Sequence, residues 1–190
     1  MGFLEELYSG GVGAGRRAVY QVKLGFSTTV VLFSFIYASN DVEKKRNLWE
    51  CLGNFNVAGL LSFVGEYFNA TMDILEKKGG STAYNNSMLD FNDFISRKGL
   101  LDLGFSGSKF TKFNNRRGGN CIWSRFDRCL ASIQGLESFS KTSISQLTRA
   151  ISYHAPLLVE PEQGGLDRKV FLYSINWKYM DGFMQMVRNF

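Results

Sequence analysis

The sequence FSTTVVLFSFIYA, from Phe26 to Ala38, is almost continuously apolar. Its Val, Phe, Thr and Ile residues favour extended backbone, and a run without regular polar alternation is typical of a strand covered on both faces. The run contains four Ser or Thr residues and is too short to cross a bilayer. We therefore predict one or two strands between Arg17 and Tyr37, inside a layered domain without a membrane partner.

The composition is typical of a globular intracellular protein. The chain has 190 residues, which suits one domain, and its 17 Phe residues can build a sizeable core. Its formal charge of +5 is a modest basic excess that is compatible with a polyanionic partner. Three cysteines without a CxxC pair and a single histidine argue against disulfides and zinc sites. We expect an intracellular location, nuclear or cytoplasmic.

Further along the chain, helical and strand-like segments alternate. Residues 1–16 are rich in Gly and predict a poorly ordered leader. Asn40 and Asp41 offer an N-cap for a helix that ends near Gly53, and a strand is expected at about 60–68. A second helix follows Ser87 and ends at Gly99, and short strand-like runs fill the remainder. This order predicts a mixed α/β or α+β layer structure.

Several motifs follow one another in a fixed order. Between Asp90 and Glu160 the chain reads GLLDLGFSG, NNRRGG, IW, RFDR and LA, and then SYHAPLL. FIYASNDVEKKRNLWE and FVGEYFNA precede them. From about Phe26 onward this arrangement closely resembles the C-terminal part of the apurinic-type endonuclease domain of plant long-interspersed (non-LTR) retrotransposons, which belongs to the endonuclease/exonuclease/phosphatase superfamily.

The resemblance implies a fold and a domain division. The expected fold is a partial four-layer α/β (α+β) sandwich of two packed mixed sheets, with the first strands missing. The truncated domain would cover residues 17–165, and residues 166–190 would be the connector that follows it in the family. The family activity is magnesium-dependent phosphodiester hydrolysis.

Four site residues of the family are retained at matching positions. Tyr37 stands where the family has a tyrosine that hydrogen-bonds the phosphate, and Asn69 matches the asparagine that helps to position the nucleophile. Asp127 matches the aspartate that orients the catalytic histidine, which is His154 here. Without the resemblance, each would be interpreted as an ordinary core or turn residue.

Two family aspartates are replaced by tyrosine, at Tyr67 and Tyr153. A phenol, with an ordinary pKa of about 10, cannot act as a base or metal ligand in place of a carboxylate at neutral pH. The family's N-terminal glutamate has no counterpart either, so we expect no metal ligands and no cofactor. Glu66 is a possible substitute, but on a regular strand its side chain points away from that of Tyr67.

A basic stretch lies between Lys109 and Arg128. It is interleaved with aromatic residues, and NNRRGG is expected to be an exposed loop. Such a surface suits the backbone of DNA or RNA, and the alternative is a solvated hairpin that keeps the protein soluble. The candidate nucleic-acid-binding residues are Lys109, Lys112, Arg116, Arg117 and Arg125.

The sequence thus predicts a degenerate, non-catalytic endonuclease-like domain with weak affinity for DNA or RNA. One alternative is a residual magnesium-dependent endonuclease that uses Glu66 or Asp73. Another is a protein-interaction module that recruits a strand to an exposed sheet edge, where the chain could also self-associate.

Overall fold

The computed structural model describes residues 4–10, 19–26, 29–54, 61–81, 85–149 and 152–160. A six-stranded sheet forms its centre, in the order β1-β2-β3-β4-β9-β6. The sheet is mixed, because β3 and β4 run parallel and every other neighbouring pair is antiparallel. The strands are β1 (Leu4–Gly10), β2 (Val19–Phe26), β3 (Thr29–Tyr37), β4 (Leu61–Tyr67), β6 (Leu100–Asp102) and β9 (Asp127–Ser132).

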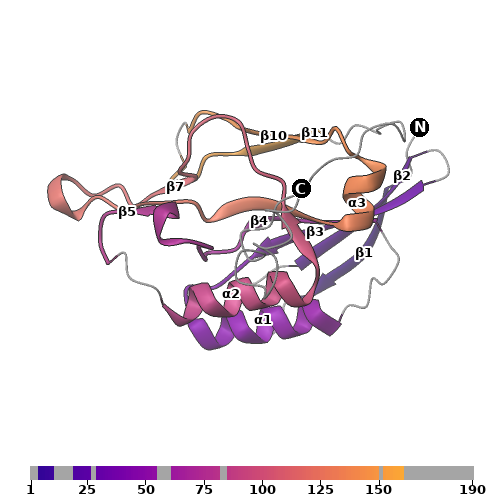
Figure 1. The fold of residues 1–190 in the computed structure, drawn as a ribbon, viewed down its shortest axis with the longest axis horizontal. Helices are drawn as coiled ribbons and strands as arrows, with labels where there is room; N and C mark the ends of the chain where they lie inside the picture. Colours follow the sequence, from indigo (N-terminus) through magenta and orange to yellow (C-terminus); the bar gives the residue numbers. More distant parts are fainter. Residues whose placement is uncertain are drawn as a thin grey trace, which may run out of the picture.

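Two helices, α1 (Val42–Asn54) and α2 (Asn86–Arg97), cover one face of this sheet (Figure 1). The Asp41 carboxylate accepts a hydrogen bond of 2.9 Å from the backbone N–H of Lys44 in the first turn of α1. Asn85 caps α2 by accepting from the N–H of Met88 at 3.0 Å, slightly earlier in the chain than the cap predicted at Ser87. Both predicted helices are therefore present.

The core between the helices and the sheet is largely aromatic. The Trp49 ring of α1 lies 5.2 Å from the Phe91 ring and 5.0 Å from the Phe94 ring of α2, measured between centroids. Ile36 and Leu130 reach this cluster from the sheet, and both are completely buried. The strand predicted from the apolar run is β3, at the centre of the sheet.

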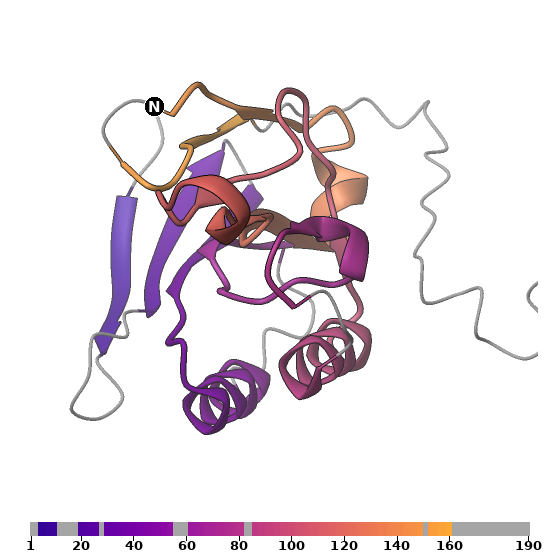
Figure 2. The ribbon, with the colours of Figure 1, turned by 90° about the vertical axis from the view of Figure 1, so that its left-hand side faces the viewer.

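The opposite face of the sheet is covered by a second layer (Figure 2). It consists of two small antiparallel sheets, β10-β11 and β5-β8-β7. Isolated bridges join Ser106 to Ser145 and Lys112 to His154. The remaining elements are β5 (Lys77–Lys78), β7 (Lys112–Phe113), β8 (Trp123–Ser124), β10 (Ser143–Gln146), β11 (Leu157–Glu160), α3 (Ile133–Ser138) and the 3-10 turns η1 (Ile74–Glu76) and η2 (Gly118–Asn120).

Several predictions about the chain ends can be compared with these elements. Strand β1 lies within residues 1–16, where the sequence predicts no regular element, and it pairs with β2. The predicted connector 166–190 lies outside the described residues, so the domain boundaries stay predictions.

In the described part of the chain, no helix is long and apolar enough to span a membrane. The central sheet ends at β1 and β6, and strand recruitment there remains a prediction.

Two leucine substitutions test the helix-covered core. Leu130 is completely buried on β9, whereas Leu89 on α2 is 58% exposed. Leu130→Ala should lower the free energy of unfolding by about 2 to 5 kcal/mol, because it removes buried apolar surface and leaves a cavity. Leu89→Ala should change it by less than about 0.5 kcal/mol. Urea denaturation measures both, and equal losses would contradict this packing.

Candidate functional site

The candidate site lies where three neighbouring strands of the central sheet meet. Tyr37 ends β3, Tyr67 ends β4 and Asp127 begins β9. The register pairs Tyr37 with Tyr67 and Tyr67 with Asp127, so the three residues form one row across the sheet. The parallel arrangement of β3 and β4 brings their carboxyl ends to one edge of the sheet. The antiparallel strand β9 starts at that same edge.

The predicted contact between Asp127 and His154 is present. Both carboxylate oxygens of Asp127 lie 3.1 Å from Nδ1 of His154. Asp127 is buried and His154 is partly buried, so solvent weakens this contact less than it would at the surface. A carboxylate that holds Nδ1 fixes the orientation of the ring and leaves Nε2 for other partners. The catalytic role of the pair is a prediction.

Thr111 holds Asp127 in place through the backbone. Its hydroxyl accepts hydrogen bonds from the N–H groups of Phe126 and Asp127 at 2.9 and 3.0 Å, and donates to the carbonyl of Ser124 at 3.4 Å. Thr111 also accepts at its own carbonyl from the N–H of Ala155, the residue after His154. One buried threonine therefore connects the strand of Asp127 to the segment that carries His154.

Tyr67 occupies the space beside this pair. Its ring stands edge-on to the His154 ring at 4.6 Å between centroids, and its hydroxyl accepts a hydrogen bond of 2.5 Å from Nζ of Lys112. Burial, followed by the charge of Asp127 and the proximity of Tyr37, raises the pKa of Tyr67 above its ordinary value. Tyr67 is therefore a neutral phenol at physiological pH, beside the ammonium group of Lys112.

The other predicted site residues lie around this centre in different ways. The Tyr37 ring lies 5.2 Å from that of Tyr67 and is 48% exposed. Tyr153 is 58% exposed, so it does not fill the site as a bulky replacement for an aspartate would. Asn69 is buried, with a left-handed φ of 50°, and its amide donates to the side chain of Asn40. That hydrogen bond points to the loop before α1 rather than to the Asp127–His154 pair.

Glu66 departs from the geometry expected of a regular strand. Its φ is 91°, in the left-handed region that residues with a side chain rarely adopt. Burial, followed by the negative charge of Asp127, raises the pKa of the Glu66 carboxyl group, and His154 lowers it. The carboxylate is thus within electrostatic range of the pair. The expectation that the Glu66 side chain points away from that of Tyr67 assumes a regular strand, and the φ of Glu66 departs from that geometry.

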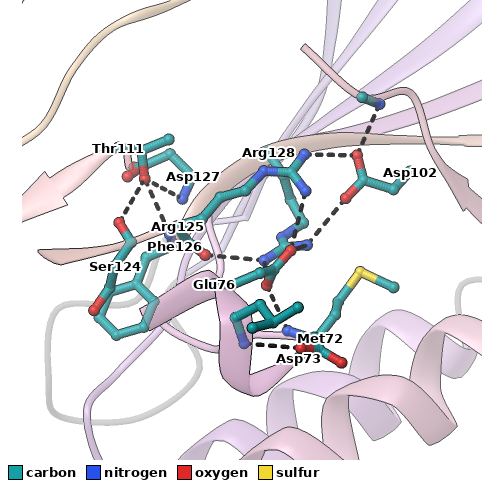
Figure 3. A network of polar contacts seen from close by, with 12 residues as sticks. Met72, Asp73, Glu76, Asp102, Thr111, Ser124, Arg125, Phe126, Asp127 and Arg128 are labelled. Atoms are coloured by element: carbon teal, nitrogen blue, oxygen red, sulfur yellow. Dashed lines mark hydrogen bonds and ion pairs between the residues drawn. The ribbon is translucent and has the colours of Figure 1, made fainter. Parts of the chain in front are cut away.

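A buried network of ion pairs lies next to Asp127 (Figure 3). The guanidinium group of Arg125 contacts Glu76 at 3.0 Å and Asp102 at 2.8 Å. Arg128 contacts the same carboxylates at 2.6 and 3.0 Å, and its side chain is 0% exposed. The network therefore contains two positive and two negative side chains and joins η1, β6 and β9.

The arginines of the network keep Asp102 ionised. Burial raises the pKa of Asp102, but the guanidinium groups of Arg128 and Arg125 lower it by more, so the net shift is downward. Asp102 therefore stays ionised in the folded protein. Sequence reasoning did not identify this network, although an arginine directly before the apolar run CLA, where a strand is expected, is a signal of a buried, paired charge.

The candidate nucleic-acid-binding residues fall into three groups. Lys109, Arg116 and Arg117 are exposed, as a backbone-binding surface requires. Lys112 is partly buried in the site and hydrogen-bonded to Tyr67. Arg125 is buried and paired with two carboxylates, so it lacks the exposure that a contact with a nucleic-acid backbone requires.

This architecture is the α/β sandwich fold of endonuclease/exonuclease/phosphatase proteins. The endonuclease domain of TRAS1, a telomere-specific non-LTR retrotransposon, superposes with a TM-score of 0.57 at 13% sequence identity. The alignment covers 76% of this chain and 62% of that domain. At such low identity the likeness shows the fold alone. The predicted fold class is thereby confirmed.

Two further solved structures share the fold. An endonuclease/exonuclease/phosphatase from Beutenbergia cavernae gives a TM-score of 0.56 at 16% identity, covering 81% of this chain and 41% of that protein. Truncated TDP2 from Caenorhabditis elegans gives a TM-score of 0.52 at 16% identity, and the alignment covers 82% of this chain and 64% of that protein. The chain thus spans less than two thirds of the length of each of these proteins. No protein-family model and no curated protein sequence matches the chain.

Replacing one arginine tests the buried network. Arg128→Met should lower the free energy of unfolding by about 3 to 5 kcal/mol, because it leaves buried carboxylates of Glu76 and Asp102 without one of their two cations. Arg97→Met is the matched control, since the Arg97 side chain is 66% exposed and pairs with Asp93 on the helix surface. That exposed pair is worth at most about 1 kcal/mol. Similar losses in urea denaturation would argue against the network.

Proposed function

We propose that this chain is a degenerate endonuclease-like domain of the kind found in plant non-LTR retrotransposons, that it is non-catalytic, and that it contacts nucleic acid weakly. The observation that carries the proposal is the environment of Tyr67. A neutral, buried phenol is packed on His154 at the position where the resemblance implies a carboxylate. The ordered motifs between Asp90 and Glu160 support the retrotransposon origin.

The donor atoms around Tyr67 do not fit magnesium, the metal that the family resemblance implies. Magnesium is held by carboxylate oxygens, water and substrate phosphate in near-octahedral geometry. Both oxygens of Asp127 serve Nδ1 of His154, and the hydroxyl of Tyr67 accepts from the Lys112 ammonium. Burial lowers the pKa of Lys112 and the charge of Asp127 raises it, and in its protonated form Lys112 repels a second cation. Among the residues placed in the site, Glu66 is the remaining carboxylate.

Without a metal-held water, phosphodiester cleavage lacks its nucleophile. When His154 is protonated, it can donate a hydrogen bond from Nε2 to a phosphate while Asp127 holds Nδ1, and Tyr37 presents an exposed phenol beside Tyr67. Such groups bind a phosphate without activating water. The side chains of the site therefore support binding of nucleic acid rather than cleavage of a phosphodiester bond.

The contact would extend to the exposed basic residues of the β7–β8 connection and the loop before β7. Lys109, Arg116 and Arg117 can approach a sugar–phosphate backbone without displacing any part of the core. Their contribution depends on salt and not on sequence, because it comes from the release of counterions. Three exposed cations give a modest affinity.

The rival function is a magnesium-dependent endonuclease that uses Glu66. The left-handed φ of Glu66 and its electrostatic coupling to Asp127 and His154 favour this candidate over other acidic residues. Asp73, the other acidic candidate, is used as a cap, because its carboxylate accepts from the N–H of Leu75 at 2.8 Å. A single carboxylate next to Lys112 remains a poor magnesium site.

Nicking of supercoiled plasmid decides between these functions. The purified full chain should nick no faster in magnesium than in chelator, and no faster than the His154→Ala variant, because no group activates water. The sample must first be shown to be folded by its cooperative unfolding. Magnesium-dependent nicking that disappears in both His154→Ala and Glu66→Gln would establish the rival endonuclease.

Charge reversal tests the nucleic-acid contact. The double variant Arg116→Glu/Arg117→Glu should weaken binding to duplex DNA and lower the slope of log affinity against log salt by about 2. The control Lys44→Glu/Arg97→Glu changes the total charge equally, but on the exposed surface of α1 and α2. Fluorescence anisotropy across a salt series measures both. If both variants weaken binding equally, the β7–β8 connection is not the contact.

A further inference from the structure

The strand register of the second layer separates its side chains into two faces. Ser124 pairs with Lys77 of β5 and with Lys112 of β7, and Lys112 also forms the isolated bridge to His154. The ammonium group of Lys112 donates to the hydroxyl of Tyr67, so this set of side chains faces the candidate site. The neighbouring residues along the same strands alternate to the other face.

That outward face carries three aromatic residues and a lysine on adjacent strands. Trp123 pairs with Lys78 of β5 and with Phe113 of β7. The N–H of Phe113 donates a hydrogen bond of 3.0 Å to the carbonyl of Tyr153, which continues the antiparallel pairing of that segment with β7. Paired residues on neighbouring strands share one face of a sheet. We call Lys78, Trp123, Phe113 and Tyr153 the outer row.

The outer row is open to solvent at both ends. Lys78 is exposed at one end, and Tyr153 is 58% exposed at the other. Between them, the half-buried rings of Trp123 and Phe113 stack on each other at 4.1 Å between centroids, with 20° between their planes. None of the three aromatic residues belongs to the buried core clusters of the described residues. Aromatic side chains that gather outside a core mark a binding surface.

Two cations accompany these rings. The guanidinium group of Arg149 lies 5.0 Å from the ring centre of Phe113 and 5.1 Å from that of Trp123. A guanidinium group stacked on aromatic rings keeps its N–H donors for an anion. Within the described residues, the ion pairs involve neither Arg149 nor Lys78. The outer row therefore combines aromatic faces with positive charge that is free to meet a phosphate.

We infer that the outer row binds a single strand of nucleic acid, with unpaired bases stacked on Trp123 and Tyr153. The phosphates of the strand pair with Lys78 and Arg149. A single strand fits because the faces of its bases are free, whereas a duplex hides them in its own stack. The cations favour a polyanion over an uncharged aromatic ligand. The inference rests on the proposed contact with nucleic acid and specifies its ligand and its place.

The dimensions of the outer row fit a short stretch of such a strand. Neighbouring strands of a sheet lie about 4.8 Å apart, so four paired residues extend over about 14 Å. Stacked nucleotides follow one another at about 3.4 Å, so this length corresponds to about four nucleotides. The loop between β7 and β8 projects from the same strands and carries the exposed Arg116 and Arg117 (Figure 1), which can hold the phosphates that follow.

The test compares a fluorescein-labelled single-stranded oligonucleotide of mixed sequence with the same oligonucleotide annealed to its complement. Binding to the full chain is measured by anisotropy in chelator. The single strand should bind more tightly than the duplex. Tyr153→Leu should weaken single-strand binding about tenfold, which corresponds to about 1.4 kcal/mol for the loss of one stacked base, and should leave duplex binding unchanged.

Two matched variants separate stacking from general damage. Tyr153→Phe keeps the ring and should bind the single strand within about twofold of the unchanged chain, since stacking does not need the hydroxyl. Leu89→Ala removes an equally exposed apolar side chain from α2 and should have no effect. Equal losses in Tyr153→Leu and Tyr153→Phe would overturn the inference.

A second pair of variants tests the cation at the end of the outer row. Lys78→Glu should weaken single-strand binding and lower the slope of log affinity against log salt by about 1. Lys44→Glu makes the same change of charge on the exposed surface of α1 and should leave that slope unchanged. Equal effects of the two variants would show that the strand does not lie on the outer row.

The outcomes distinguish this inference from the proposed function. Duplex binding that depends on Arg116 and Arg117, without a preference for the single strand, would overturn the inference and leave the proposed function intact. Single-strand binding that Tyr153→Leu leaves unchanged would also overturn the inference alone. Binding to neither form by a folded sample would contradict both.

Discussion

The buried pairing of Arg125 and Arg128 with Glu76 and Asp102 is the interaction on which the site depends. These four residues come from η1, β6, the connection between β8 and β9, and β9 itself, and the carboxylates are far from the arginines in the sequence. Burying four charges is tolerable only because each cation contacts both carboxylates. Asp127 lies between the two arginines, so the network that joins these elements also fixes the carboxylate that holds His154.

The elements that hold Asp127 in place do not depend on a metal ligand. The position of Asp127 is set by Thr111, the strand register and the arginine network, none of which involves a metal. The Tyr67 ring packs against His154 and Phe126, and its hydroxyl accepts a hydrogen bond from Lys112. Under the proposed function, the site has exchanged a metal-binding carboxylate for a phenol and an ammonium group.

The sequence predicts those helices and strands whose signals, an apolar run or a capping residue, lie within the element or directly beside it. The apolar run at β3, the caps near Asp41 and Asn85, and the Asp127–His154 contact all follow from patterns or motifs in the chain. The left-handed φ of Glu66 does not follow, because strand alternation assumes a regular backbone. The burial of Arg125 could not be predicted from a basic stretch, since its two carboxylate partners lie 49 and 23 residues away.

His154 is the single histidine of the chain and gives a direct probe of the central claim, that this site does not hold a divalent cation. The measurement is the NMR signal of its imidazole during titration with Mn²⁺, a paramagnetic substitute for Mg²⁺. We predict that millimolar Mn²⁺ leaves this signal sharp in the unchanged chain and broadens it in a folded Tyr67→Asp variant. Selective broadening in the unchanged chain at micromolar Mn²⁺ would show a bound cation beside His154 and contradict the claim.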